Sequence, residues 1–326
     1  MDPLTHTATG LFLSRAGLKR WTPLATPILL VAANAPDCDI AALAGGPLNY
    51  LHYHRHLTHS LAALPVLALA AVALVRLAAR KPVNWWGAWA AAAIAVASHL
   101  ALDLTNAYGV RLLLPFSDRW LRLDLTNIVD LWIWAVVLVA VAGPFLARLV
   151  GSEIASANVK SRTHGRGFAI FALAFLLLYN GGRSVLHGRA VTVLESWMYR
   201  GTAPLRVAAM PGAANPWRWR GLVETGDFYA VEDVDLLGNF DPEEAAIFHK
   251  AEAEPAVEAA RRTAAFQEFL RFSQYPLLRV SPVAEPENAR QVELTDMRFT
   301  GFVARAVVTG GGQVVESSFS FGRIRP

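Results

Sequence analysis

The chain has 326 residues, of which 54% are hydrophobic and 17% are charged, whereas soluble domains average about 45–50% and 25%. This composition, with a mean hydropathy of +0.33, excludes an ordinary cytosolic enzyme, a disordered chain and a collagen-like repeat. The single cysteine, Cys38, excludes a disulfide scaffold and a multi-cysteine zinc site.

Charge is divided unevenly along the chain. Residues 1–186 contain 15 Lys and Arg against 8 Asp and Glu, whereas residues 187–326 contain 15 against 18. The positive excess therefore lies with the hydrophobic part. The positive-inside rule of membrane proteins explains this better than a phosphate-binding groove does, so the expected partner is a lipid bilayer and no nucleic acid is expected.

The first forty residues predict two short apolar helices, over residues 3–18 and 21–36, with Lys19 and Arg20 between them. Each would be roughly 22 Å long, less than the roughly 30 Å hydrocarbon core of a bilayer. We therefore expect a helical hairpin with a basic tip. A signal peptide is the competing interpretation, because residues 32–35 (Ala-Ala-Asn-Ala) resemble a cleavage site, although Pro36 directly after them disfavours cleavage.

Four longer apolar stretches follow, over residues 60–79, 85–104, 128–150 and 167–186. Each is long enough to cross a membrane, which takes about 20 residues. Trp85 and Trp132 lie near the ends of such stretches, where indole rings favour the interface. The sequence thus predicts, for residues 1–186, an α-helical membrane domain of about six helices, the first two short.

Loop charges predict the orientation of these helices. One alternate set of loops holds ten basic residues, namely Arg15, Lys19, Arg20, Arg76, Arg80, Lys81, Arg148, Lys160, Arg162 and Arg166. The other set holds four, namely Arg55, Arg111, Arg119 and Arg122. The basic set should face the cytoplasm, which places residues 187–326 outside it.

The second part, residues 187–326, is predicted to be a small soluble, extracytoplasmic α+β domain. Asp241, followed by Pro242 and two glutamates, is typical of a helix start, and a helix over residues 241–273 should break at Pro255. Residues 291–299, 302–309 and 313–321 are predicted strands, the last two joined by a turn at three glycines, 310–312.

Histidine and aspartate gather on the outward face of the predicted helices. His99 and Asp103 lie four residues apart, so both side chains can reach one ion from one face of a helix. Further candidates come from segments that flank neighbouring helices: Asp37, Asp39, His54 and His59. Of the histidines in this run, His52 and His56 are the two most expected not to bind the metal. His164, His187 and His249 fall outside the group.

These ligand types predict a divalent metal site. Histidine and aspartate together suit Zn²⁺, with Mn²⁺ or Fe²⁺ as alternatives, whereas Mg²⁺ and Ca²⁺ prefer more oxygen ligands. The number of candidates allows one or two ions, and a two-ion site would indicate hydrolysis. Each residue alone is equally compatible with a structural role, so the prediction rests on the whole group.

The motifs resemble the YdjM-like family of inner-membrane proteins, which are taken to be metal-dependent hydrolases. The resemblance covers roughly residues 1–145. It is carried by Thr5-His6, Asp37-x-Asp39, His54-Arg55-x-x-Thr58-His59-Ser60, His99-x-x-x-Asp103, Gly109 and Pro115-Phe116. Position 56, often glycine in such runs, is histidine here. The resemblance implies a multi-pass bacterial inner-membrane protein with a His/Asp metal site.

A more distant similarity is to zinc-dependent phospholipase C, whose ligands follow a comparable order. In this chain the order would be His6, Asp37 or Asp39, His54 or His59, then His99 and Asp103. This similarity implies phosphoester substrates, among them phospholipids. It also accounts for His6, which the predicted hairpin brings level with Asp37.

Two interpretations remain at this point. The first is a membrane-bound, metal-dependent hydrolase in which Arg55 stabilises the developing phosphate charge, Asp39 takes part in catalysis, and Thr58 and Ser60 orient ligands or cap a helix. The second is a non-enzymatic membrane protein in which the metal clamps helices and residues 187–326 bind a partner. An open coordination position would favour the first, and a closed four-ligand site the second.

Overall fold

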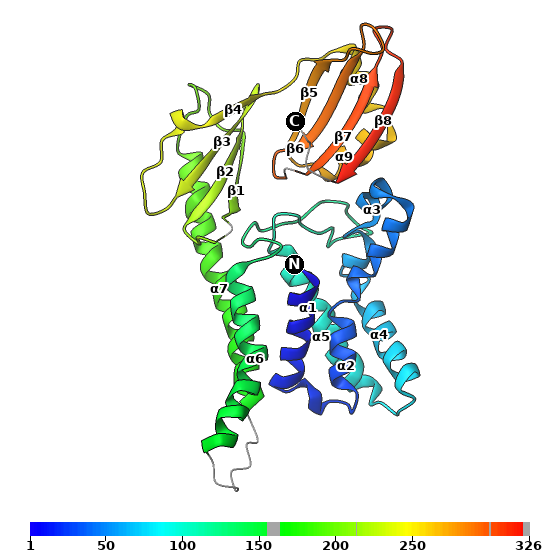
Figure 1. Cartoon of the computed structure of the whole chain (residues 1–326), viewed down its shortest axis with the longest axis vertical. Helices are drawn as coiled ribbons and strands as arrows, with labels where there is room; N and C mark the ends of the chain where they lie inside the picture. Colours follow the sequence, from blue (N-terminus) through cyan, green and yellow to red (C-terminus); the bar gives the residue numbers. More distant parts are fainter. Residues whose placement is uncertain (155–163, 213, 300, 322–326) are drawn as a thin grey trace. The chain divides into compact units, whose positions relative to one another are not determined.

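The computed structural model describes residues 1–154, 164–212, 214–299 and 301–321 (Figure 1). Lys160 and Arg162 of the predicted basic loops lie outside these ranges. The chain divides into two compact units. The helical unit comprises Met1–Asp39, Arg55–His187 and Pro211–Pro216, and the sheet unit comprises Ile40–His54, Gly188–Met210 and Trp217–Pro326.

The first unit is built from α-helices joined by short 3-10 segments. The helices are α1 (Pro3–Ala16), α2 (Ala25–Ala32), α4 (Leu64–Ala79), α5 (Trp85–Leu104), α6 (Leu131–Ile154) and α7 (His164–Glu195). The 3-10 segments are η1 (Leu18–Arg20), η2 (Pro36–Gly45) and η3 (Leu57–His59). The predicted 85–104 helix is confirmed, whereas the last helix continues to Glu195 rather than ending at residue 186.

Among the described residues, two helices are long and apolar enough to cross a membrane, Trp85–Leu104 and Gly165–Glu195. The number rises to four if two bent pairs each form one broken span. One pair is α2 with η2, bent by 48°, and the other is Pro47–His59 with α4, bent by 91°. The helical part thus carries two to four candidate spans, and both bends lie in segments that bear the predicted metal ligands.

Small side chains let α2, α4 and α5 approach one another closely. Ala91, Ala92 and Ala95 of α5 are fully buried in this core, as is typical of helix contacts inside membranes. The α1–α2 and α4–α5 turns lie at one end of these helices and carry exposed Lys19, Arg20, Arg80 and Lys81 (Figure 1). His99 and Asp103 lie in the last turns of α5, at the opposite end.

The second unit contains two four-stranded sheets in chain order, β1-β2-β3-β4 and β5-β6-β7-β8. The first has β1 (Arg206–Pro211), β2 (Arg218–Glu224), β3 (Phe228–Asp235) and β4 (Ala246–His249). The second has β5 (Pro276–Pro282), β6 (Arg290–Asp296), β7 (Phe302–Val308) and β8 (Val314–Phe321), with the helices α3 (Pro47–Tyr53), α8 (Pro255–Arg261) and α9 (Ala264–Phe272) against it. All pairs within β2–β4 and β5–β8 are antiparallel.

The sequence prediction for this unit is confirmed in part. The three C-terminal strands form, and the glycine turn joins β7 to β8. The predicted helix from Asp241 is wrong: Asp241 caps only the 3-10 turn Pro242–Glu244, and Ala246–His249 pairs with β3. Sheet pairing thus overrides the local helix-start signal, and the helices begin later, at Pro255 and Ala264.

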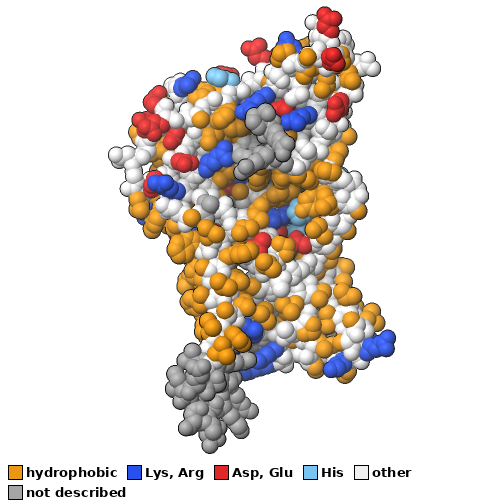
Figure 2. All heavy atoms as spheres, in the orientation of Figure 1, with side chains coloured by type: hydrophobic (Ala, Val, Ile, Leu, Met, Phe, Trp, Pro, Cys, Tyr) orange, Lys and Arg blue, Asp and Glu red, His pale blue; other side chains and the backbone are white. Residues whose placement is uncertain are grey.

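Figure 2 shows how the surface differs between the two units: hydrophobic side chains cover much of the visible helical unit, and acidic side chains gather on the sheet unit. Exposed large apolar residues on the helices include Leu77, Leu138, Leu177 and Leu178, each at least 68% exposed. In water such a surface would be a liability, and in a bilayer it faces its natural solvent. The helical unit is therefore suited to lipid.

Candidate metal centre

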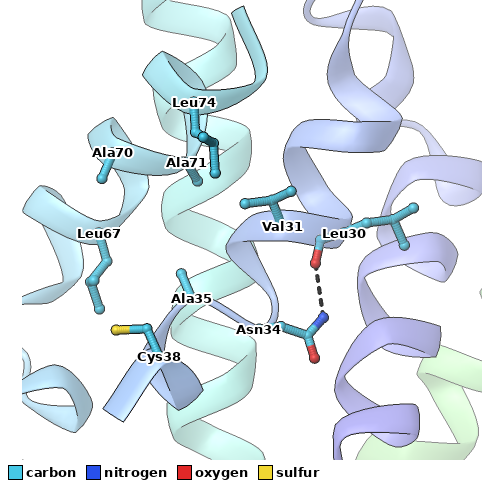
Figure 3. A pocket seen from close by; sticks show the side chains of 9 residues that line it. All are labelled: Leu30, Val31, Asn34, Ala35, Cys38, Leu67, Ala70, Ala71 and Leu74. Atoms are coloured by element: carbon cyan, nitrogen blue, oxygen red, sulfur yellow. Dashed lines mark hydrogen bonds between the residues drawn. The ribbon is translucent and has the colours of Figure 1, made fainter. Parts of the chain in front are cut away.

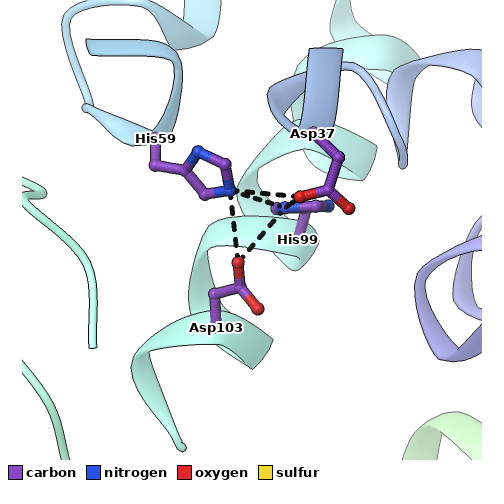
Figure 4. Close-up of side chains that lie close together, drawn as sticks. All are labelled: Asp37, His59, His99 and Asp103. Atoms are coloured by element: carbon purple, nitrogen blue, oxygen red, sulfur yellow. Dashed lines mark hydrogen bonds and ion pairs between the residues drawn. The ribbon is translucent and has the colours of Figure 1, made fainter. Parts of the chain in front are cut away.

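Four side chains converge in the helical unit: Asp37, His59, His99 and Asp103 (Figure 4). Asp37 comes from η2, His59 from η3, and the other two from the end of α5. His59, His99 and Asp103 have fully buried side chains, whereas the Asp37 side chain is 25% exposed. Four residues from three segments are thus brought together, at a point that water can reach from the Asp37 side.

The distances between the facing atoms fit a small divalent cation. His59 Nε2 lies 3.2 Å from His99 Nε2, 3.3 Å from Asp103 Oδ2 and 3.4 Å from Asp37 Oδ1. His99 Nε2 lies 3.3 Å and 3.6 Å from the same two oxygens. Ligands held about 2.0–2.2 Å from a tetrahedral ion are about 3.3–3.6 Å apart, so the separations that involve His59 or His99 match the edges of such a site.

The opposite nitrogens of both imidazoles are held by acceptors. His99 Nδ1 lies 2.7 Å from the Ala33 carbonyl oxygen, to which it must donate. His59 Nδ1 lies 3.2 Å from Asp39 Oδ2. With the protons on Nδ1, both Nε2 atoms present lone pairs to each other and to two carboxylate oxygens. This electron-rich cluster, with Asp103 Oδ2 buried and lacking a hydrogen-bond partner among the described residues, calls for a positive charge at its centre.

Asp39 supports the centre from behind His59 and is not one of the four converging residues. Its Oδ2 accepts hydrogen bonds from the Arg55 backbone N–H at 2.8 Å and from Thr58 Oγ1 at 3.2 Å. The Arg55 backbone adopts a positive φ of 55°, which is uncommon for a residue with a side chain. Asp39 therefore stabilises the strained turn that delivers His59 to the centre.

Arg55 is buried beside Asp103, the residue that the two histidines also face. Its NH2 donates to Asp103 Oδ1 at 3.0 Å, and NH1 donates to Asn106 Oδ1 at 3.1 Å and to the Gly109 carbonyl oxygen at 3.2 Å. The guanidinium also lies 4.7 Å from the centre of the Tyr108 ring. Only Nε has no hydrogen-bond partner among the described residues. Arg55 thus holds one oxygen of Asp103 and leaves the other to the centre.

His6 lies at the edge of the centre. Its ring stacks on His99, with centroids 3.7 Å apart, and its Nε2 lies 3.4 Å from Asp103 Oδ1. Both ring nitrogens are buried without a hydrogen-bond partner among the described residues. The α-amino group of Met1 also contacts Asp103 Oδ1. The structure thus brings His6 to the site, beside the carboxylate oxygen that faces away from His59.

The remaining candidates lie elsewhere. His54 ends α3 in the sheet unit, where its ring stacks on Tyr50, so the structure does not place it among the four converging residues. His52 in the same unit lies 2.7 Å from Glu268. Ser60 caps the turn after η3 by accepting from the Ala63 N–H at 3.1 Å. Asn106 and the Ala33 carbonyl were not predicted, since no spacing rule points to an amide or a backbone oxygen.

Comparison with known proteins relates the N-terminal part of the chain to a family of membrane proteins. Residues 1–190 match the sequence profile of the family described as YdjM inner membrane protein. The uncharacterized protein YfhP of Bacillus subtilis (strain 168) is 29% identical over 152 residues, which cover 44% of this chain and 46% of YfhP. The chain thus matches less than half the length of this relative.

No solved structure matches this chain significantly. The family match spans all four converging residues as well as His6, Asp39 and Arg55. It also includes all of Trp85–Leu104 and most of Gly165–Glu195, the two described helices that are long and apolar enough to cross a membrane. The match covers more than half of the chain, which therefore belongs to the YdjM inner membrane protein family.

Proposed function

We propose that this protein is a metal-dependent hydrolase of the inner membrane, acting on phosphoester or lipid-type substrates at the outer face. The observation that carries this proposal is the set of four facing ligand atoms, 3.2–3.6 Å apart where the distances involve His59 or His99. Zn²⁺ is the preferred ion because the separations fit its tetrahedral radius, with Mn²⁺ or Fe²⁺ as alternatives.

The ligand types favour catalysis over a purely structural site. Structural zinc sites are typically rich in cysteine, whereas hydrolytic sites use histidine with carboxylate. Cys38 follows Asp37 directly, yet it is absent from the group of four. Asp37 is the most exposed of the four side chains, so substrate and water would enter beside it.

A divalent ion held here would supply a Lewis acid and an activated water for hydrolysis. Asp39 and the Ala33 carbonyl keep both imidazoles in the tautomer that leaves Nε2 free. Arg55 acts as a positioning residue for Asp103, and its Nε–H is left for a substrate oxygen. His6, stacked on His99, is placed to hold a proton or a second ion beside Asp103 Oδ1.

A structural clamp is the second candidate function, and one observation favours it. Four protein ligands close a tetrahedral shell, and closed shells are typical of structural sites. In this case the metal would fasten η2 and η3 to α5, and the sheet unit would bind a partner. The two candidates differ in a measurable way. Only the hydrolase needs a coordination position for water or substrate, which requires either that Asp37 leaves the ion or that the ion accepts a fifth ligand.

The test begins with the metal content of the purified full chain, followed by a phosphodiesterase and lipase screen with that metal. His99→Ala and Asp103→Ala should each lose the bound metal while the protein still inserts into membranes. His249→Ala, in β4 of the sheet unit, is the matched control and should retain it. Equal metal content in all three variants would contradict the site, and metal without activity on any ester would favour the clamp.

A further inference from the structure

A second feature of the helical unit lies beside the centre: a cavity of about 670 Å³ between α2, the start of η2 and α4 (Figure 3). Its lining is almost entirely apolar, with Leu30 and Val31 on one side and Leu67 and Leu74 on the other. We call it the α2–α4 groove. Its volume lies within the roughly 300–1,000 Å³ range of small-molecule sites.

The groove begins next to the candidate metal centre. Cys38 lines it, and Cys38 directly follows Asp37. Asn34 also lines it and directly follows Ala33, whose carbonyl holds His99. From Leu67 to Leu74 the lining then follows α4, and the seven helical steps between these two residues span about 10 Å. One end of the groove is thus close to the ligands, and the other is bounded by helix alone.

The lining excludes water as the natural occupant. A buried water needs two to four polar partners. The Asn34 amide nitrogen already donates to the Leu30 carbonyl at 2.9 Å and to Thr7 Oγ1 at 3.0 Å. The other lining side chains are leucine, valine, alanine and the Cys38 thiol. The groove therefore offers contacts to hydrocarbon and almost none to polar groups.

The groove also lies between the two bent helix pairs that together qualify as broken membrane spans, α2 with η2 and Pro47–His59 with α4. At that depth the surrounding solvent is lipid. A polar end at a metal centre joined to an apolar groove matches the two ends of a phospholipid. We propose that the α2–α4 groove holds an acyl chain of the substrate, whose phosphoester head group lies at the Asp37 end. This inference rests on the proposed function.

The test uses a phosphatidylglycerol with a photoreactive diazirine on its acyl chain, incorporated with the full chain into lipid nanodiscs. After illumination, cross-linked peptides are mapped by mass spectrometry. We expect labelling of residues 30–38 and 67–74 in excess over Leu138 and Phe145, which are 69% and 62% exposed on α6. Uniform labelling of all exposed apolar positions would show annular lipid only and would overturn the proposal.

A matched pair of variants on α4 makes the test specific. Ala70 lines the groove and is exposed, so tryptophan can be placed there without entering the helix core. Ala70→Trp should lower groove labelling about tenfold, the loss expected when two methylene contacts are excluded. Leu69→Trp, one residue away, half exposed and outside the lining, should leave labelling unchanged. Equal labelling in both variants would overturn the proposal.

Two further readouts separate this inference from the proposed function. Cys38 is the single cysteine, so a bifunctional thiol cross-linker reports whether a second copy of the chain occupies the groove. A cross-linked dimer that Ala70→Trp abolishes would overturn the lipid assignment. Metal content is measured on the same samples. If the protein holds its metal but the groove residues are not labelled, only the acyl-chain inference is overturned. Labelling without bound metal would instead defeat the hydrolase proposal.

Discussion

Asp37 and Asp39 are two residues apart in η2, yet they serve opposite nitrogens of one imidazole. Asp37 Oδ1 lies 3.4 Å from His59 Nε2, and Asp39 Oδ2 lies 3.2 Å from His59 Nδ1. The sequence indicated both carboxylates as candidate ligands. The sequence could not show which carboxylate faces the ion and which holds the back of the imidazole, because this depends on how η3 places the His59 ring between them.

Substitution of these two residues should have unequal effects. Asp37→Asn replaces a charged facing carboxylate with a neutral, weakly ligating amide and should abolish stable metal binding, whereas Asp39→Asn should weaken metal affinity by about 10–100-fold, as expected for a group that orients a ligand. Competition with a chelator of known affinity measures both constants. Asp235→Asn, at the end of β3 in the sheet unit, where the carboxylate pairs with Arg218, serves as the control. The reverse order of effects would exchange the assignments of Asp37 and Asp39.

Arg55 offers a second residue-level prediction. Its fork contacts Asp103, Asn106 and Gly109 together, and a lysine cannot reproduce that geometry with one nitrogen. Arg55→Lys should therefore keep the metal, lower the melting temperature in detergent and lose most hydrolysis of any phosphodiester substrate identified. Full activity in Arg55→Lys would remove the guanidinium from the proposed mechanism.

The residues of the centre were predictable to different degrees. His99 and Asp103 follow from a four-residue spacing on a long apolar helix, where a carboxylate is costly unless it is used. His59 and Asp37 were proposed because their segments join neighbouring helices. His54 was equally attractive by sequence, but α3, which it ends, packs with α9 and β8 of the sheet unit. Only long-range packing distinguishes His54 from His59.

At the scale of helices, Gly10 fixes the spacing of α1 and α2. A methyl group at Gly10 would lie 2.7 Å from the Leu29 carbonyl oxygen and 3.0 Å from Ala33 Cβ. Gly10→Ala should destabilise the protein by about 1–3 kcal/mol through overpacking. Because Ala33 holds His99, metal affinity should fall as well.

The control for this variant is Gly17→Ala, at the end of α1. Among the described residues beyond its two chain neighbours, no atom lies within 4 Å of a methyl group at that position, and its φ of 169° lies outside the left-handed region that favours glycine. Thermal unfolding in detergent and chelator competition measure the two effects. If both variants behave alike, the close approach of α1 and α2 does not support the centre.

Among the strands, Asp296 at the end of β6 forms a fully buried ion pair with Arg298. Burial raises the pKa of this carboxyl, but the guanidinium and the Ser273 hydroxyl outweigh it and hold the pKa below its usual value. A lowered pKa contributes stability above the unfolded value of about 3.9, and that stability is lost as the pH falls through the folded pKa.

Asp296→Asn should therefore cost about 3–5 kcal/mol near pH 7, because it removes the carboxylate charge that faces the buried Arg298 guanidinium. The difference from the parent chain should begin to shrink below about pH 4, where the carboxyl of the unfolded parent takes up a proton, and should go on shrinking until the pH falls below the lowered pKa of the folded carboxyl. Denaturant unfolding followed by tryptophan fluorescence between pH 3 and 7 measures it. A difference that stays constant with pH would exclude the ion pair as its source.

Helices were easier to predict from this sequence than strands. An apolar stretch of membrane length such as Trp85–Leu104 needs no partner to be recognised. Turn residues such as Pro211-Gly212 and Gly226-Asp227 separate strands β1 to β3, but they do not show which segments pair, and β4 follows an apparent helix start at Asp241. Their existence depends on pairing such as that of Phe248 with Tyr229, which no local pattern contains.

At the scale of the molecule, the ten-to-four excess of basic residues in alternate loops predicts that residues 187–326 lie outside the cytoplasm. Alkaline phosphatase fused after Arg200 should be active, whereas the same fusion after Lys81, in the exposed α4–α5 turn, should be inactive. Activity only after Lys81 would reverse the orientation and move the centre to the cytoplasmic face.

The assignment of Ile40–His54 to the sheet unit has a consequence for biosynthesis. α3 leaves the ribosome early, but α9 and β8, against which it packs, are made some two hundred residues later. Asp39 and Arg55 border this segment, and His59 follows it closely. A ribosome that stalls before β8 therefore releases a chain whose metal ligands are all present but whose α3 lacks one of the two elements against which it packs. We therefore expect the centre to be completed only after β8 has been translated.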